Sequence, residues 1–435
     1  MPEVVKKITG EVIVPAAILI EVQKEVKNIF DFKKKFEEYL AKGVTEILEV
    51  ILGGAILLEA SDIHLEPEEA QAKLRVRVDG VLQDVIVFSN KTYESLLSRI
   101  KLLSGIKLNI TDRPQDGRFS ILLEKEAIEI RVSTLPAEYG ETIVLRILNP
   151  KSLIELEALG LRKDLLEIFQ KEVKKPNGMI IVTGPTGSGK TTTLYAFLKK
   201  VQKPEIKIIT IEDPIEYRLG GISQTQVNPQ KGYDFASGLK SIMRQDPDVI
   251  LVGEIRDLET ANIALQAALT GHLVFATLHT NDAAGTVARL MALGANPSNI
   301  GPAINIAIAQ RLIRRICKKC QKTETVSLEI LKKLKKELKN LPKEIKFPQL
   351  KMGLKIPKAN GCKTCNFTGY RGRTGIFESF LIDDEMEKFI LTSPSIAALR
   401  ELAIKKGMVT MKIDGIIKVL EGITTLEELE RVTGE

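Results

Sequence analysis

The sequence contains no tryptophan, only three histidines and four cysteines, and no long apolar run. Its longest apolar stretches, 12–20 and 50–58, fall well short of the roughly 18–20 residues that cross a bilayer. No signal-peptide cleavage pattern follows the first of them. We therefore expect a cytosolic chain whose contact with a membrane is peripheral. A helix-turn-helix and an aromatic-rich strand pattern are also missing, so we expect no specific nucleic acid as partner.

The four cysteines fall into two CxxC pairs, Cys317 with Cys320 and Cys362 with Cys365, separated by 41 residues. Four thiolates suit tetrahedral Zn²⁺, and in a cytosolic chain such pairs favour metal over disulfides. A redox CxxC pair is the main alternative, although two pairs in one chain without thioredoxin-like surroundings argue against it. The sequence therefore predicts a structural zinc site.

The net charge of +7 is spread unevenly along the chain. Residues 311–373 contain 19 Lys or Arg and 4 Asp or Glu, a charge of +15, which leaves −8 for the remainder. A solvated lysine-rich face is one explanation. The other explanation is a basic patch that faces anionic lipid or an acidic partner. Both explanations stay open at the level of sequence.

Length and composition predict two to three domains, since the 435 residues are 44% hydrophobic and 27% charged. The first 60 residues are charged, with a helical pattern. Residues 61–150 contain strand-like runs around one helical stretch and a hairpin turn at Asp79-Gly80, which predicts a small α+β domain. Its expected elements are strands at 73–78, 81–88, 128–133 and 142–148 and a helix at 93–103.

From residue 151 to about residue 310, apolar strands alternate with helical patterns. The expected strands are 179–182, 206–211, 249–252 and 273–277. This alternation is typical of an α/β domain with a parallel sheet and crossover helices. The final third of the chain holds the zinc element within 311–375, including a lysine-rich loop, and short helices over 380–435.

A phosphate-binding loop follows the first of these strands. The pattern G-x-x-x-x-G-K-[ST] is preceded by an apolar strand and followed by a helical stretch, which is the context that the motif requires. Backbone N–H groups and the helix N-terminus would bind phosphates, Lys190 would neutralise them, and the Thr191 hydroxyl would ligate Mg²⁺. The expected nucleotide-binding residues are Gly184, Pro185, Thr186, Gly187, Ser188, Gly189, Lys190, Thr191 and Thr192.

Two carboxylates lie at the ends of neighbouring predicted strands. Glu254 follows strand 249–252, after Gly253 at a position where many P-loop enzymes place an aspartate. It would organise the Mg²⁺ shell or polarise the attacking water. Glu212 follows strand 206–211 and is the preferred general base, ahead of Glu254. A helix cap at Glu254 and a turn stabilised by Asp-Pro at Glu212 are the simpler alternatives.

Two of the three histidines, His272 and His279, bracket the predicted strand 273–277. With the neighbouring hydroxyls they suggest a γ-phosphate sensor that couples hydrolysis to motion. A hydrogen-bonded core histidine is the alternative for His272. Zinc ligation by this pair is disfavoured because the cysteines already complete a site.

Together these residues resemble the secretion ATPases of type II secretion and type IV pilus assembly, the GspE/PilB family. The resemblance covers roughly residues 44–435 and rests on a joint pattern of motifs. Besides the P-loop, the matching stretches are SDIHLEP (61–67), RVDGVL (77–82), QDGRF (115–119), RVSTLP (131–136), EDPIEY (212–217), RQDPDVILVGEIRD (244–257), TGHLVFATLHTND (270–282), AQRLIR (309–314) and TGYRGRTGIFE (368–378).

The resemblance implies a RecA-like P-loop motor domain over 151–435, in a hexamer, that hydrolyses ATP with Mg²⁺. It implies that a small N2-like, PAS-like domain over 61–150 precedes the motor and rocks against it. In the family, Gly253 is the usual residue, Glu212 belongs to the Asp box, Glu254 to Walker B, and His272 and His279 to the His box. Arg131 and Arg146 match arginines that the family swings onto the nucleotide, which would place a mobile cation on the transferring phosphoryl group. Cross-strand pairing is the alternative role for these two arginines.

In the same family, the tetracysteine element marks extension or secretion motors, and retraction motors lack it. The resemblance therefore implies an ATPase that powers assembly of a type IV pilus or a type II secretion pseudopilus at the cytoplasmic face of the inner membrane. The expected partners are further copies in a homo-hexamer, an inner-membrane platform protein, associated cytoplasmic assembly proteins and an anionic lipid surface. The alternatives are a retraction or conjugation-type ATPase and a DNA-translocating P-loop protein. Longer family members carry an additional N-terminal module whose functions we do not carry over, because only about 60 residues precede SDIHLEP.

Overall fold

The computed structural model describes residues 10–13, 16–123, 126–150, 153–339, 341–342 and 345–434. The chain divides into two compact units. The first unit is Met1–Ser152 with Cys317–Cys320 and Asn360–Arg371, and the second is Leu153–Ile316, Gln321–Ala359 and Gly372–Glu435. The domain boundaries expected near residues 60 and 150 stay predictions; residues 1–9, 151 and 152 lie outside the described residues. Among the described helices, none is both long and apolar enough to span a bilayer.

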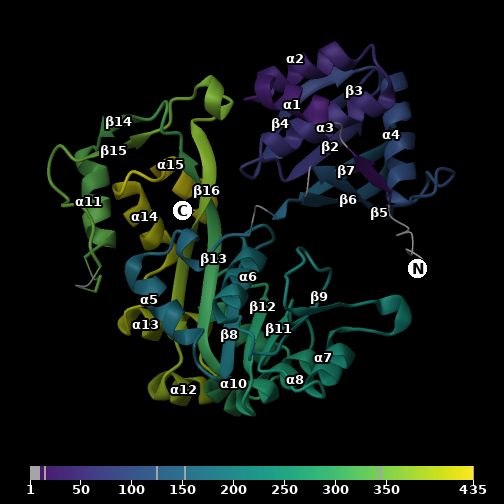
Figure 1. Cartoon of the computed structure of the whole chain (residues 1–435). Helices are drawn as coiled ribbons and strands as arrows, with labels where there is room; N and C mark the ends of the chain where they lie inside the picture. The colour runs from purple at the N-terminus through teal and green to yellow at the C-terminus, as the bar shows by residue number, and fades with distance from the viewer. Residues whose placement is uncertain are drawn as a thin grey trace. The chain divides into compact units, whose positions relative to one another are not determined.

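The first unit is built on a seven-stranded sheet in the order β1-β5-β6-β7-β2-β3-β4, with helices packed on one face (Figure 1). Strand β1 pairs parallel with β5, and the other neighbouring strands pair antiparallel. The strands are β1 (Glu11–Ile13), β2 (Asp62–Pro67), β3 (Ala72–Val78), β4 (Val81–Phe88), β5 (Gln115–Leu123), β6 (Glu126–Ala137) and β7 (Gly140–Leu148). The helices are α1 (Ala16–Glu25), α2 (Ile29–Tyr39), α3 (Val44–Leu57) and α4 (Asn90–Ser104). Apart from β1, which interrupts the helical pattern expected for the first 60 residues, the elements expected from the sequence are present.

Side-chain alternation explains why this sheet has one covered face. Leu74 and Val76 of β3 point into a core shared with Phe32 and Phe36 of α2, and the charged residues between them point to the opposite face. The hairpin between β3 and β4 turns at Asp79 and Gly80, both with positive φ, as a type I′ turn requires. The opposite face of the sheet is therefore polar, and the helices described for this unit pack on the apolar face.

The second unit contains a seven-stranded sheet in the order β10-β9-β11-β12-β8-β13-β16, and the pairings from β10 to β13 are parallel. Its central strands match those predicted, although β9 begins two residues later than expected. The strands of this sheet are β8 (Gly178–Thr183), β9 (Ile208–Glu212), β10 (Ser223–Gln226), β11 (Val249–Val252), β12 (Leu273–Leu278), β13 (Ile304–Ile316) and β16 (Tyr370–Leu381). The helices up to β13 are α5 (Lys163–Glu172), α6 (Lys190–Val201), α7 (Phe235–Met243), α8 (Leu258–Leu269), α9 (Ala284–Ala292) and α10 (Pro297–Ala303).

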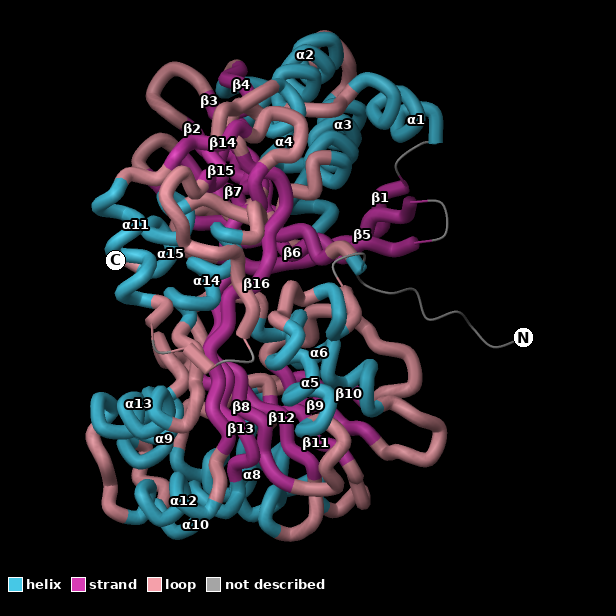
Figure 2. Tube along the Cα trace, turned by 90° about the vertical axis from the view of Figure 1, so that its left-hand side faces the viewer, coloured by secondary structure: helices cyan, strands magenta, loops and turns pink. Residues whose placement is uncertain are grey.

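Helices cover both faces of this sheet, which confirms the predicted α/β class (Figure 2). Alternate residues of one strand enter two separate cores: Ile181 of β8 packs with α7 and α8, whereas Ile180 and Val182 pack with α5 and α6. A strand that is buried on both faces reads as a continuous apolar run, as 179–182 does. The helices α12 (Asp384–Leu391), α13 (Ile396–Lys405), α14 (Met411–Leu420) and α15 (Leu426–Thr433) complete the unit.

The lysine-rich segment between the cysteine pairs is not the loop that the sequence suggested. It contains β14 (Lys322–Thr325), α11 (Leu328–Glu337) and β15 (Lys355–Lys358), and the two strands pair antiparallel. Ser327 caps α11 by accepting the Ile330 N–H, and Leu331 and Leu334 are buried on one face of the helix. The expectation of a loop was wrong because the lysines hide a leucine spacing of three and four residues.

Candidate functional site

The P-loop leaves the carboxyl end of β8 and enters α6 at Lys190. Gly184, Gly187 and Gly189 all have positive φ, so these positions require glycine's conformational freedom. The loop turns its backbone at the N-terminus of α6, where unpaired N–H groups bind anions. Pro185 and Thr186 are exposed at its tip, and Thr191 and Thr192 lie half-buried in the first turn of α6. The structure thus brings all nine predicted nucleotide-binding residues to one loop and helix start.

Lys190 folds back over this loop. Its Nζ donates to the carbonyl oxygens of Gly184 and Pro185, at 2.8 and 3.3 Å. Burial lowers the pKa of Lys190, and the carboxylate of Glu254 opposes that shift. Among the described residues, the hydrogen-bond partners of Lys190 are these two backbone carbonyls, which phosphate oxygens would replace.

The strands beside β8 hold the loop and the acidic residues in place. Thr183 at the end of β8 exchanges hydrogen bonds with Thr280, which follows β12; its hydroxyl lies 2.8 Å from both the Thr280 N–H nitrogen and Oγ1. Gly253 donates its N–H to the Ile211 carbonyl at 2.8 Å, and the Thr277 hydroxyl donates to the Gly253 carbonyl at 2.5 Å. The carboxyl ends of β8, β9, β11 and β12 therefore meet at one edge, as expected for a ligand site in a parallel sheet.

Steric crowding explains why position 253 is a glycine. A Cβ atom there would lie 3.1 Å from the Ile211 carbonyl oxygen and 3.2 Å from the Glu212 Cα. A side chain here therefore requires the end of β9 to shift by a few tenths of an ångström. The residue that is unusual among P-loop enzymes is thus explained by the close approach of β11 to β9.

Glu254 lies at this edge with two charged neighbours. Its carboxylate forms a short ion pair with Arg256 and lies 3.3 Å from the His279 Nε2, and Arg256 also lies 3.8 Å from Asp213. The Glu254 side chain is mostly buried, whereas His279 is 52% exposed. Glu254 is therefore held at the mouth of the site, close enough to Lys190 to influence its pKa.

The two histidines of the suggested sensor lie at opposite ends of β12. His272 precedes the strand, and its Nδ1 lies 3.1 Å from the Ala267 carbonyl oxygen at the end of α8. With about 3.3 Å per strand residue, the seven-residue spacing to His279 corresponds to roughly 23 Å. Only His279 reaches the edge of the sheet where the P-loop begins, so a sensor made of both histidines at one nucleotide is not what this unit presents.

Glu212 occupies a closed polar pocket at the end of β9. Only 3% of the residue is exposed. Its carboxylate accepts a short hydrogen bond from Tyr195 of α6, one of 2.5 Å from Thr210 and one of 3.2 Å from Gln224. Burial raises the pKa of Glu212, and the hydrogen bonds from Thr210, Tyr195 and Gln224 oppose this rise. A buried carboxyl group with no cation among these partners and a raised pKa is typical of a general base.

The two predicted arginines belong to the first unit, where they form part of a row. Arg131 of β6 and Arg146 of β7 are cross-strand partners, so both side chains lie on the polar face of that sheet. The Arg146 Nε lies 3.1 Å from Asp62, and the Arg131 Nε lies 3.7 Å from Glu129. The register continues the row on both sides with Arg118, opposite Arg131, and Arg77, opposite Asp62. Sequence reasoning missed these last two arginines, although both lie within the quoted motifs QDGRF and RVDGVL.

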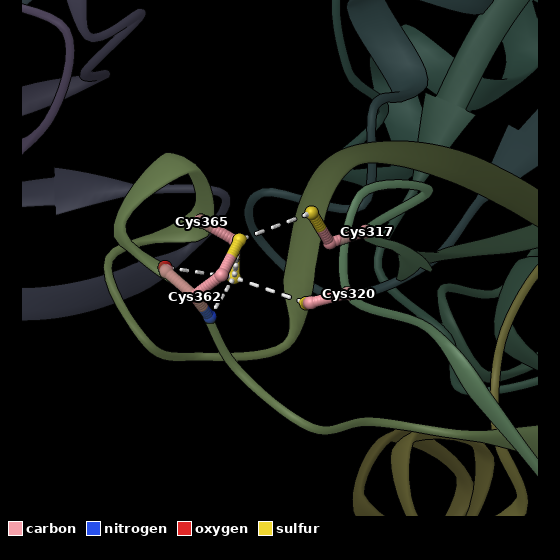
Figure 3. Close-up of side chains that lie close together, drawn as sticks. All are labelled: Cys317, Cys320, Cys362 and Cys365. Carbon is pink, nitrogen blue, oxygen red and sulfur yellow. Dashed lines mark hydrogen bonds between the residues drawn. The ribbon is translucent and has the colours of Figure 1, made fainter.

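The four cysteines converge in space (Figure 3). Their Sγ atoms all lie within 4.8 Å of one another. Three of the Sγ–Sγ distances are 3.7, 3.7 and 4.0 Å, close to the ~3.8 Å that 2.3 Å Zn–S bonds give in a tetrahedron. Backbone N–H groups of Cys362 and Gly369 point at the Cys365 Sγ, as they do toward thiolates that bind metal. The donor set and its spacing fit Zn²⁺.

A second cluster of possible ligands, Glu21, Glu25 and Glu38, contains a cation of its own. The ammonium group of Lys35 lies 2.8 Å from Glu25 and 3.1 Å from Glu38, and it makes a shorter contact with Glu21. Lys35 is buried. This cluster is therefore an ion-pair network that joins α1 to α2 and not a metal site.

Comparison with known proteins agrees with this geometry. The family model described as type II/IV secretion system protein matches residues 38–431. The chain belongs to that family. Its relatives include the type II secretion system ATPase E of Vibrio cholerae, 45% identical over 90% of this chain and 76% of the relative. The type II secretion system protein E of Dickeya dadantii is 44% identical with the same coverage.

The type IV pilus assembly ATPase PilB of Thermus thermophilus is 42% identical over 88% of this chain, which spans 42% of that longer relative. Among solved structures, the pilus retraction motor PilT with bound ADP is 27% identical with a TM-score of 0.58, over 88% of this chain and 95% of PilT. The Legionella pneumophila ATPase DotB shares the fold, with a TM-score of 0.63 at 22% identity over 88% of this chain and 94% of DotB. The curated relatives are thus named for type II secretion and type IV pilus assembly, and a retraction motor is among the solved structures that share the fold.

Proposed function

We propose that this member of the type II/IV secretion family is a Mg²⁺-dependent ATP hydrolase that powers assembly of a type IV pilus or a type II secretion pseudopilus. The observation that carries the proposal is the edge where the P-loop, Lys190 and Glu254 meet. The relatives at 42–45% identity are named for type II secretion or pilus assembly, whereas the retraction motor is 27% identical. The four clustered cysteines also favour an assembly motor over the retraction, conjugation-type and DNA-translocating alternatives.

In this proposal each residue at the edge has one task. The N–H groups of the P-loop and the Lys190 ammonium bind the β- and γ-phosphates. The Thr191 hydroxyl and Glu254 would hold Mg²⁺, which when bound neutralises charge that develops on the transferring phosphoryl group. His279, beside Glu254, senses the terminal phosphate.

Glu212 is the group that we propose takes the proton from the attacking water. Its raised pKa makes the carboxylate a stronger base than an exposed glutamate. Tyr195 reaches it from α6, the helix that begins at Lys190, so the pocket of Glu212 is joined to the phosphate-binding element. To reach a water molecule, the carboxylate must give up some of these hydrogen bonds. Because one of them comes from α6, we propose that its action as a base is linked to movement of that helix.

Arg131 and Arg146 are proposed to supply mobile positive charge to the γ-phosphate. They lie side by side on the polar face of their sheet, and 56% of the Arg146 side chain is exposed. Arginine suits this task because its planar fork binds phosphate oxygens in pairs. Arg146 pairs across strands with Asp62 of β2 at 3.1 Å, whereas Glu129, which lies 3.7 Å from Arg131, belongs to the same strand as Arg131.

We propose further that the chain acts as a homo-hexamer at the cytoplasmic face of the inner membrane, with a platform protein and cytoplasmic assembly proteins as partners. Helix α11 supplies a basic surface for an anionic lipid or acidic partner. Charge reversal of Lys332, Lys333, Lys335 and Lys336 should weaken the stimulation of ATP hydrolysis by anionic liposomes. The same reversal at Lys163, Lys171, Lys174 and Lys175, in and after α5, is the matched control. Unchanged stimulation in the α11 variant discards this surface.

Replacement of the chromosomal gene by a Lys190→Ala allele tests the whole proposal in the source cell. Surface pili and secreted enzymes are then scored separately. We expect one of the two products to be lost while the variant protein is present at its normal level. Normal amounts of both products would overturn the proposal, and the product that disappears identifies the machine that the motor serves.

A further inference from the structure

Gln310 lies in the middle of β13, with 1% of the residue exposed, and both ends of its carboxamide are used. Its Oε1 accepts a hydrogen bond of 2.7 Å from the Thr193 hydroxyl in the first turn of α6. Its Nε2 donates a hydrogen bond of 2.7 Å to the Ser188 carbonyl in the P-loop. Because a carbonyl can only accept, the amide has one orientation that satisfies both partners.

The backbone around Gln310 is equally close to the loop. Strand β13 pairs with β8 as far as Ala309 opposite Thr183, so residue 310 lies alongside the point where the P-loop begins. A Cβ atom on Gly184 would lie 2.4 Å from the Gln310 carbonyl oxygen, and one on Gly189 would lie 3.0 Å from its Nε2. Gln310 therefore contacts the first glycine, the last glycine and the peptide between them.

The loop also contains a hydroxyl for which the described residues offer no partner. Ser188 is 3% exposed, and its Oγ makes no hydrogen bond within the part of the chain that the structure describes. A buried hydroxyl that makes no hydrogen bond destabilises the conformation that buries it. The Gln310 amide holds the Ser188 peptide, and with it this hydroxyl, in a fixed place.

We propose that Gln310 is a positioning residue that shapes the P-loop for the triphosphate. The inference rests on the proposed ATPase function and adds a strand on the far side of β8 to the nucleotide site. Without the amide, the Ser188 carbonyl and the Thr193 hydroxyl would both lose a buried partner. The loop would then relax away from the geometry in which its N–H groups converge on phosphate.

Binding of a fluorescent ATP analogue to the full-length chain with Mg²⁺ measures the effect. Gln310→Met keeps the length of the side chain but removes both hydrogen bonds, and we expect its Kd to rise at least tenfold with KM following. Gln202→Met is the matched control, because the Gln202 side chain donates to the Gly220 carbonyl of an exposed loop away from the P-loop, and its Kd should match that of the wild type. A Gln310→Met protein that binds with wild-type affinity overturns the proposal.

Position 193 supplies an independent series if Gln310→Met does not fold. Thr193→Val removes the hydroxyl and should weaken ATP binding, whereas Thr193→Ser keeps it and should restore most of the affinity. Equal affinity of the two variants would overturn the proposal. A combined Thr193→Val and Gln310→Met variant should bind about as well as Gln310→Met alone, since both changes break the same chain of bonds. If instead the wild-type chain binds ATP and the Gln310 variants do too, only this inference fails and the ATPase proposal stands.

Discussion

Removal of the Tyr195 hydroxyl perturbs the candidate general base without touching the nucleotide. In Tyr195→Phe the Glu212 carboxylate keeps its hydrogen bonds from Thr210 and Gln224 but loses the third one. A hydrogen bond to a charged group contributes roughly 1.5–3 kcal/mol, and the protonated carboxyl retains part of it. At 1.36 kcal/mol per pKa unit, the pKa of Glu212 should rise by about one further unit.

The sign of the effect follows from the role of the ionised form. A general base must be deprotonated, so the acid limb of kcat against pH should move to higher pH by about one unit in Tyr195→Phe. On that limb the variant should be up to about tenfold slower, and the two profiles should converge at higher pH. Thr210→Val removes a different donor from the same carboxylate and should move the limb in the same direction.

A steady-state assay of phosphate release from pH 5 to pH 9, at saturating ATP and Mg²⁺, measures these profiles. Tyr233→Phe is the matched control, because the partner of the Tyr233 hydroxyl among the described residues is the neutral Thr225 hydroxyl, at 3.0 Å. Coincident acid limbs for Tyr195→Phe and the wild type would refute the reasoning. Glu212→Gln should then be tested directly, since a general base accounts for about 10²–10⁴-fold in rate.

Three further predictions concern stability, sterics and metal. Glu428→Gln should speed hydrogen exchange in α15 and cost about 3 kcal/mol there, because it removes the buried carboxylate charge that pairs with Arg314 of β13 at 2.6 Å. Because hydrogen bonds from Arg431 and Arg314 lower the pKa of Glu428 despite its burial, the wild-type advantage should be full above about pH 4.5 and fade as the pH falls below it, and a pH-independent difference would contradict this. Gly253→Asp should lower ATP turnover by displacing Glu212, and a fully active variant would show that the strand ends can separate. Metal analysis should find one Zn²⁺ per wild-type chain and almost none in Cys362→Ser. The variant should still bind ATP, because the cysteines and the P-loop belong to different compact units, and a wild-type zinc content in the variant would contradict the zinc site.

Sequence alone was enough to predict those parts of the site whose residues follow one another along the chain. The strand, the P-loop and the helix start at Lys190 are consecutive, so their arrangement follows from local pattern alone. The clustering of the four cysteines could also be predicted from the sequence, since few arrangements other than a metal site suit two CxxC pairs. The α/β class followed from strands that alternate with helical patterns, and it is confirmed.

Contacts between distant segments could not be predicted in this way. Gln310 reaches Ser188 from a position 122 residues later, and no periodicity marks it as part of the nucleotide site. The groups that surround Glu212 come from helix α6, from β9 and from β10, so the burial of its carboxylate depends on how these three elements pack. The suggested γ-phosphate sensor combined His272 and His279, which bracket one strand, although the two ends of a strand lie far apart.

The central claim is that this chain cleaves the terminal phosphate of ATP. Its most direct test is release of inorganic phosphate by purified, zinc-loaded chain, with Mg²⁺ and with EDTA, in the presence of anionic liposomes. The account predicts Mg²⁺-dependent turnover in the wild type and none in Lys190→Ala, which should keep its fold and its zinc. A wild-type preparation that binds zinc and assembles yet releases no more phosphate than Lys190→Ala would contradict the account.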